Sequence, residues 1–256
     1  MRRIRPISHE DRLSVVDHLD ELRSRLMICV GAFVVAMCLT AWQNHRVLDI
    51  MNAPLPDNVK HPITLGPAEA FYTTITQSAY AALLIALPVI LYQLYAFVLP
   101  AFNPRERRVA LPLLLLVPLL FITGVLFCYF AVLTPAMKFL LNFNADQFNT
   151  QVRARDYYSF ITLLMLAMGI AFQVPVGILA LCKIGVLNVE RLRRGRRYAA
   201  VVIVVLASLL PTIDPLSLIL ESLPMYALYE LSILMAAAWG RPLGDLSEEP
   251  AAEGSH

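Results

Sequence analysis

The feature that most constrains this chain is its longest stretch without charge. No Asp, Glu, Lys or Arg occurs from Ala70 to Pro104. About 20 mainly apolar residues are enough for a helix to cross roughly 30 Å of hydrocarbon, so this stretch is long enough to span a membrane. Over the whole chain 58% of residues are hydrophobic and 16% are charged, whereas soluble domains carry about 25% charge. Both observations predict an all-α integral membrane protein.

Charge-free runs predict six transmembrane helices within one membrane domain, residues 1–240. The runs cover residues 26–44, 70–100, 109–137, 157–182, 198–213 and 215–239. The fifth would reach only about 24 Å at 1.5 Å per residue, and Glu221 and Glu230 interrupt the sixth. Because the turn residues PTIDP join these two runs, we expect a short, tight hairpin that thinned lipid or partner helices accommodate. The acidic tail, residues 241–256, is expected to be disordered.

Lys and Arg are divided unequally between the two sets of loops. Of the 21 such residues, 16 lie before the first run or after the second, fourth and sixth. Short loops rich in Lys and Arg stay in the cytoplasm, so both termini are predicted to be cytoplasmic. The basic start MRRIRP precedes an apolar run that begins only at Leu26 and has no small-residue cleavage site, so we expect the amino terminus to be retained.

Several classes of function lack their sequence signals. The four cysteines lie in or beside apolar runs without metal-ligand or CxxC spacing, so no disulfide framework, metal site or cofactor is expected. All five histidines lie outside the runs and no GxSxG motif occurs, so an enzyme is not expected. A GxxxxGK[ST] loop for nucleotide hydrolysis is also missing. A small-solute secondary transporter is the alternative, because Gln173, Glu221 and Glu230 could line a pathway, although transporters usually contain internal repeats.

The segment FVLPAFNPRERR, residues 97–108, places Glu106 among three arginines. In one interpretation Asn103 caps a helix, Pro104 occupies its first position and Glu106 bonds free backbone donors, as in a capping box. In the other, Glu106 receives a cationic ligand. The two interpretations are compatible, and the direction of the flanking arginine side chains decides between them.

The segment LSVVDHLDELRSRL, residues 13–26, has a similar double meaning. We expect Ser14 to cap a helix with an apolar stripe, which consists of Val15, Leu19, Leu22 and Leu26. The alternative is an amphipathic helix lying on an anionic membrane surface. That alternative does not explain the acids Asp17, Asp20 and Glu21 near the other face.

Five motifs in order resemble the TatC family, and the resemblance runs from about Asp17 to Trp239. They are DHLDELRSRL (17–26), FVLPAFNPRERR (97–108), FQVP (172–175), RGRRY (194–198), and IDPLS with PMYALYE (213–217 and 224–230). TatC proteins are multispanning receptors of the twin-arginine translocase, which recognise consecutive arginines in the signal peptides of folded proteins. The resemblance therefore implies a protein of the bacterial cytoplasmic membrane that binds such peptides.

The family pattern gives several residues a role. It implies that Glu106 is the principal acid for the arginine pair and Glu21 the second, since a guanidinium donates two parallel hydrogen bonds to one carboxylate. Arg23 and Phe97 match positions used for recognition or assembly, as does Pro54 of the APL segment. The resemblance also implies single-span TatA- and TatB-type partners, a homo-oligomeric receptor complex and export driven by the proton-motive force.

Two departures from the family pattern concern the fourth and sixth runs. Gln173 stands where the family commonly has Glu; we expect it to face a polar cavity, the alternative being that its amide satisfies backbone groups freed near Pro175. In the IDPLS motif, with Asp214 and Ser217, the family often has a Gln after the Ser, where partner helices dock. We suggest that Glu221 takes over as the docking point; the alternative is that it lies in water at the external interface.

Overall fold

The computed structural model describes residues 9–56, 59, 61–98, 107–147, 150–183, 186–210 and 214–239. Among these residues β-pairing is limited to one isolated bridge between Ile63 and Arg153. The helices in chain order are α1 (His9–Trp42), α2 (Asn44–Asn52), α3 (Glu69–Val98), α4 (Arg107–Phe127), the π-helix η3 (Cys128–Leu133), α5 (Thr134–Asn142), α6 (Ala154–Ala171), α7 (Val174–Lys183), α8 (Val189–Arg194), α9 (Arg196–Ser208) and α10 (Pro215–Trp239).

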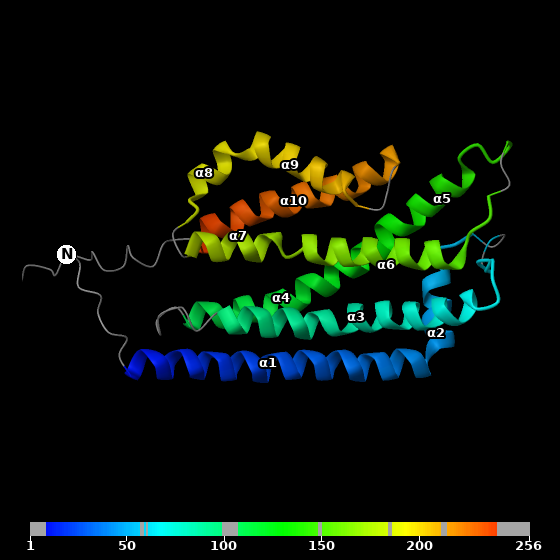
Figure 1. Ribbon diagram of the computed structural model, residues 1–256. Helices are drawn as coiled ribbons and strands as arrows, with labels where there is room; N and C mark the ends of the chain where they lie inside the picture. Colours follow the sequence, from blue (N-terminus) through cyan, green and yellow to red (C-terminus); the bar gives the residue numbers. More distant parts are fainter. Residues whose placement is uncertain are drawn as a thin grey trace, which may run out of the picture.

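The long helices form a bundle with two distinct ends (Figure 1). The α2 end holds α2 and the starts of α3 and α6, and the α8 end holds the start of α1, the end of α3 and α8. α1 packs along α3, whereas α4, η3 and α5 form one inclined rod that crosses the bundle. Within the described residues, five helical stretches are long and apolar enough to cross a membrane: His18–Trp42, Glu69–Phe97, Leu114–Asn142, Ala154–Cys182 and Pro215–Ala238.

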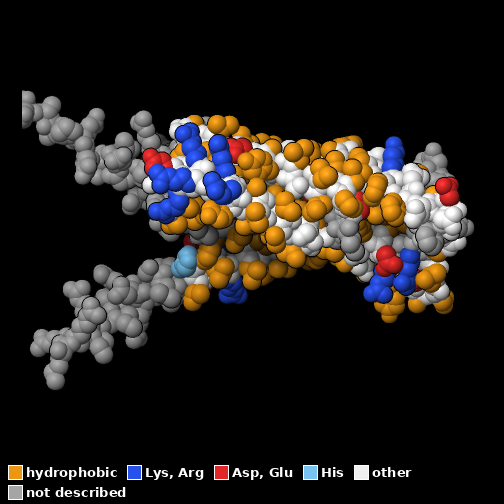
Figure 2. Space-filling view, turned by 90° about the horizontal axis from the view of Figure 1, so that it is seen from above, with side chains coloured by type: hydrophobic (Ala, Val, Ile, Leu, Met, Phe, Trp, Pro, Cys, Tyr) orange, Lys and Arg blue, Asp and Glu red, His pale blue; other side chains and the backbone are white. Residues whose placement is uncertain are grey.

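Between its two ends the surface of the bundle is apolar. Figure 2 shows hydrophobic side chains over the middle of the molecule and most charged side chains towards the ends. Large apolar side chains such as Leu26, Leu115 and Val201 are exposed. Because apolar surface of this extent marks contact with a membrane or a partner, this band is a surface for lipid or for partner helices.

The largest hydrophobic cluster of the described residues lies where α4 and η3 meet α6. Leu164 and Met168 of α6 are fully buried in this cluster. The two helices approach closely because Gly169 has no side chain: a Cβ built there would lie 2.5 Å from a ring carbon of Phe121 on α4. η3 follows at the bend of the rod, just before Pro135, whose missing N–H interrupts regular α-helical bonding.

The carboxyl-terminal hairpin is only partly the one predicted. α9 has 13 residues, about 20 Å of helix, and Figure 1 shows that α9 ends short of the α2 end. α10, in contrast, occupies the whole predicted run, residues 215–239, as one unbroken helix of 25 residues, so it is not short. Its two acids do not interrupt it because Glu221 is buried inside the protein and Glu230 pairs with Arg196.

The start of α1 also differs from the prediction. α1 begins at His9, so Ser14 lies inside the helix and does not cap it. Glu10, Arg12 and Leu13, which all favour helix, carry the helix upstream of Ser14. α1 then runs without a break to Trp42, so residues 13–26 are not a separate surface helix.

Candidate functional site

Glu21 lies near the α8 end, where α1 packs against α3. Its Oε1 accepts a hydrogen bond from Arg25 Nε (2.9 Å), and Arg25 Nη1 donates to Gln93 Oε1 of α3 (3.0 Å). Within the described residues both bonds from Arg25 to Glu21 fall on Oε1, so Oε2 can accept from another donor. The Glu21 side chain is 34% exposed. It is therefore a carboxylate that is held at one oxygen and accessible at the other.

His18 and Phe97 extend this contact. Their rings stack with centroids 4.4 Å apart and an interplanar angle of 17°. His18, Glu21 and Arg25 lie on one face of α1, since they are three and four residues apart, and Gln93 and Phe97 are one turn apart on α3. We call these five residues the α1–α3 cluster. The structure thus brings together two predicted site residues, Glu21 and Phe97.

Two other predicted residues are not part of the α1–α3 cluster. Arg23 is exposed and, two residues from Glu21, lies towards the opposite face of α1. Glu106 lies outside the described residues, as do Asn103 and Pro104. In the chain Glu106 comes directly before Arg107, where α4 begins. Its place beside Glu21 stays a prediction.

Gln173 lies at the break between α6 and α7. It is 7% exposed, and its Nε2 donates to the carbonyl oxygen of Val117 on α4 (3.2 Å). α6 ends at Ala171 and α7 begins at Val174, one residue before Pro175. The acceptor belongs to α4 and not to the backbone freed near Pro175, so the alternative role of the amide stays a prediction. The polar cavity expected around Gln173 also stays a prediction.

Asp214, Ser217 and Glu221 form the buried start of α10. Asp214 Oδ1 accepts the backbone N–H of Ser217 (2.8 Å), and Pro215 stands between them at the first helical position, which is typical of a helix N-cap. Glu221 is fully buried and lies within electrostatic range of Cys128 on η3. It is therefore not in water, and a partner helix would reach it only if α10 moved.

Pro54 is buried in the turn after α2. The neighbouring carbonyls of Ile50 and Met51 accept hydrogen bonds from the hydroxyls of Tyr129 (2.7 Å) and Tyr157 (2.6 Å). Because the last carbonyls of a helix lack intrahelical donors, these tyrosines of η3 and α6 complete the end of α2. Pro54 therefore belongs to a structural cap, and its part in recognition or assembly stays a prediction.

The RGRRY and PMYALYE motifs meet at the α8 end. Arg196 Nη2 donates to Glu230 Oε2 (2.8 Å), and the hydroxyl of Tyr226 donates to the other carboxylate oxygen (3.2 Å). The hydroxyl of Tyr229 donates to the carbonyl of Leu192 in α8 (2.8 Å). These contacts tie α8 and α9 to α10.

The described residues do not contain a metal site. No group of three or more His, Cys, Asp or Glu side chains among them is close enough to hold an ion. All four cysteines are free thiols, and Cys128 and Cys182 are buried.

The comparison with known proteins shows which family the chain belongs to. The model of the Sec-independent protein translocase protein (TatC) matches residues 17–224. The chain belongs to the TatC family. It is 36% identical over 234 residues to TatC of Escherichia coli, covering 90% of each chain, and 36% identical over 233 residues to TatC of Magnetococcus marinus, covering 88% of this chain and 84% of the relative.

The fold of this TatC-family chain agrees with a solved structure. A crystal structure of the twin-arginine translocase receptor TatC has a TM-score of 0.73 with it at 36% identity, covering 88% of this chain and 100% of the other. A second crystal structure of that receptor, in DDM, has a TM-score of 0.74. These matches confirm the predicted all-helical, multi-span membrane fold. They identify a transport protein of the translocase-receptor type, not an enzyme, and leave the small-solute transporter alternative without support.

Sequence reasoning missed three members of the α1–α3 cluster. Arg25 could have been found as the cation four residues after Glu21 on the same helix face. Gln93 could have been found as a polar residue inside an apolar span, where such residues usually face protein. His18 carried no comparable signal, because its partner Phe97 belongs to another helix.

Proposed function

We propose that this protein binds the twin-arginine signal peptides of folded precursor proteins at the α8 end, with Glu106 as the principal acid and Glu21 as the second. The observation that carries the proposal is the α1–α3 cluster, in which the Glu21 carboxylate is fixed by Arg25 and partly exposed. A guanidinium forms two parallel bonds with a carboxylate, so two neighbouring arginines suit two acids. The stacked rings of His18 and Phe97 add a surface on which a guanidinium can lie.

We further infer that the protein crosses a bacterial inner membrane six times, counting α9, with both termini in the cytoplasm. The excess of Lys and Arg in alternate loops supports this orientation. The α8 end then faces the cytoplasm, where precursor proteins carrying the signal peptide are folded. Recognition at that end precedes passage through the membrane.

The protein would act as a scaffold rather than as a conduit. We infer that it assembles with further copies of itself and with TatA- and TatB-type single-span proteins, and that the proton-motive force drives export. The exposed apolar band between the two ends offers surface for such helices. Arg23, Pro54 and Gln173 are assigned to recognition, assembly or transport, as is the start of α10 with Asp214, Ser217 and Glu221; docking at Glu221 would require α10 to move.

The test is the binding of a labelled twin-arginine peptide to the purified full chain. We expect Glu106→Gln to abolish binding and Glu21→Gln to weaken it about tenfold to a hundredfold, from the loss of one charge-assisted bond of about 1.5 to 3 kcal/mol. Asp20→Asn is the matched control, because Asp20 is the exposed neighbour of Glu21 on α1. Equal binding of a peptide with both arginines replaced by lysine, or full binding by a membrane-inserted Glu106→Gln protein, would refute the proposal.

A further inference from the structure

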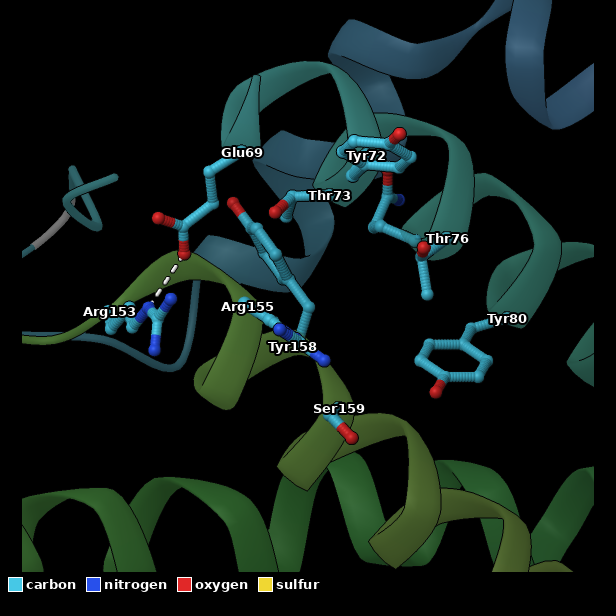
Figure 3. A pocket seen from close by; sticks show the side chains of 10 residues that line it. Glu69, Tyr72, Thr73, Thr76, Tyr80, Arg153, Arg155, Tyr158 and Ser159 are labelled. Atoms are coloured by element: carbon cyan, nitrogen blue, oxygen red, sulfur yellow. Dashed lines mark hydrogen bonds and ion pairs between the residues drawn. The ribbon is translucent and has the colours of Figure 1, made fainter. Parts of the chain in front are cut away.

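A polar pocket of about 540 Å³ opens at the α2 end, far from the α1–α3 cluster. It lies between the start of α3 and the start of α6 (Figure 3). α3 contributes Tyr72, Thr76 and Gln77 to its wall, and α6 contributes Arg155, Tyr158 and Ser159. The wall thus combines hydroxyl groups, an amide and a guanidinium.

The charges of the pocket leave one cation available. Arg153 Nε donates to Glu69 Oε1 (2.6 Å), and this pair closes one side of the pocket. Arg155 is exposed and has no ion pair among the described residues. Glu69 offsets the charge of Arg153, which the exposed Asp156 outside the pocket lining also approaches at 3.9 Å. The residues that line the pocket therefore keep one net positive charge, that of Arg155, which favours an anionic occupant.

Buried polar atoms at the pocket also lack partners. Thr73 is 8% exposed and Gln77 is fully buried, yet Thr73 Oγ1 and Gln77 Oε1 have no hydrogen bond within the described part of the chain. Buried polar groups in native proteins are nearly always paired. Both residues line the pocket, so its base suits an occupant that brings hydroxyl groups as well as charge.

The position of the pocket is that of a lipid headgroup. The membrane-spanning stretches of α3 and α6 start at Glu69 and Ala154, and tyrosines are enriched where spans meet water. An apolar pocket of about 440 Å³ lies alongside, lined by residues of α2, α3, α4 and α6. The walls of the two pockets touch where Gln77 Nε2 contacts Met51 Sδ (3.2 Å), because Gln77 lines the first pocket and Met51 lines the second.

We propose that the polar pocket binds the headgroup of an anionic phospholipid that carries hydroxyl groups, of the phosphatidylglycerol type. Arg155 and the hydroxyls of Tyr80 and Ser159 hold the phosphodiester, and the headgroup hydroxyls bond Gln77 and Thr73. An acyl chain follows α3 towards the apolar pocket. The site is independent of signal-peptide binding, since it lies at the opposite end of the bundle.

The test measures lipid retention by the delipidated full chain in native mass spectrometry. The probes are phosphatidylglycerol and phosphatidylcholine with identical acyl chains, together with inorganic phosphate. We expect phosphatidylglycerol to bind about tenfold more tightly than phosphatidylcholine, and Arg155→Gln to remove this preference, as expected for one charge-assisted contact. Arg46→Gln is the control, because Arg46 is an exposed arginine of α2 that does not line the pocket.

A second pair of variants tests the volume of the pocket. Thr76→Trp should fill its mouth and abolish retention of phosphatidylglycerol, whereas Leu94→Trp, an exposed position on α3 outside the pocket, should not. Equal retention of the two lipids, or the same result for Arg155→Gln and Arg46→Gln, would overturn the proposal. If inorganic phosphate alone displaces phosphatidylglycerol completely, the occupant is a free phosphate and the lipid assignment is wrong.

Discussion

The α2 end of the bundle and the α1–α3 cluster at the opposite end are held together by different kinds of contact. At the α2 end, hydroxyls of Tyr129 and Tyr157 bond backbone carbonyls of α2, Tyr158 bonds Asn52 (3.0 Å), and Ile63 exchanges two backbone bonds with the segment before α6. At the α8 end, the α1–α3 cluster joins α1 to α3 through side chains alone, and these side chains are partly exposed.

This difference means that the α2 end is fixed, whereas the side-chain contacts of the α1–α3 cluster can be exchanged for contacts with a ligand. The bond from Tyr157 to the carbonyl of Met51 is buried, and a buried bond to backbone is costly to leave unmade, so the α2 end is the more fixed of the two regions. Ion pairs between exposed side chains contribute little, so the contacts of Glu21 can be replaced by those of a ligand at small cost. A receptor needs both, because a fixed frame positions the groups that exchange.

The largest expected loss of stability comes from disturbing the packing of α4 on α6, which connects the two ends of the bundle. Gly169→Leu should destabilise the protein by about 3 kcal/mol, because the new side chain overlaps the ring of Phe121 and overpacking of a core is costly. Thermal unfolding in detergent measures the change. Gly177→Leu is the control, since a Cβ at Gly177 meets nothing within 4 Å; equal losses in the two variants would contradict the close approach.

A smaller loss of stability should appear at the α2 end. Tyr157→Phe leaves the carbonyl of Met51 without its hydroxyl donor, and we expect a loss of about 1 to 2 kcal/mol. Peptide binding should not change. Tyr72→Phe, at an exposed tyrosine of α3, should change neither property. An unaltered unfolding temperature for Tyr157→Phe would show that the α2 end is not fixed by these bonds.

The smallest effect on stability is expected at the α8 end. Arg25→Gln should cost below about 1 kcal/mol, and it should strengthen binding of a twin-arginine peptide by up to about fivefold, because the peptide no longer competes with Arg25 for Glu21. Calorimetric titration measures this gain. Arg193→Gln, at an exposed arginine of α8, tests the general effect of removing one charge. Weaker binding by Arg25→Gln alone would mean that Arg25 orients Glu21 for the peptide.

Much of the fold follows from charge-free runs, because a long apolar stretch has few alternatives to a spanning helix. The runs do not predict α2, since Asn44, His45 and Arg46 give its first turn a polar composition. The search for charge-free runs also ignores the hydroxyl group of tyrosine. It counts Tyr129 and Tyr157 as apolar residues and so does not predict that they cap α2. Such bonds join residues from distant parts of the chain, so no local pattern contains them.

The candidate site was predictable one residue at a time but not as a set. The acids of the ELR and PRERR segments stand out in the sequence, and the family pattern selects Glu21, Phe97 and Glu106. The bond from Arg25 to Gln93 joins residues 68 positions apart, and only the packing of α1 on α3 creates it. Glu221 shows the converse, because a charge that suggested an exposed docking point is buried by the helices around it.

Because α1 is one continuous helix, its two ends move together. Its 34 residues amount to about 51 Å of helix, well beyond the roughly 30 Å of hydrocarbon, and no joint separates the embedded part from the turn that carries Glu21. A change in the tilt of the membrane-embedded part of α1 therefore moves the Glu21 carboxylate with it. A bilayer thickness that alters the tilt of α1 would therefore also alter the height of Glu21 above the membrane.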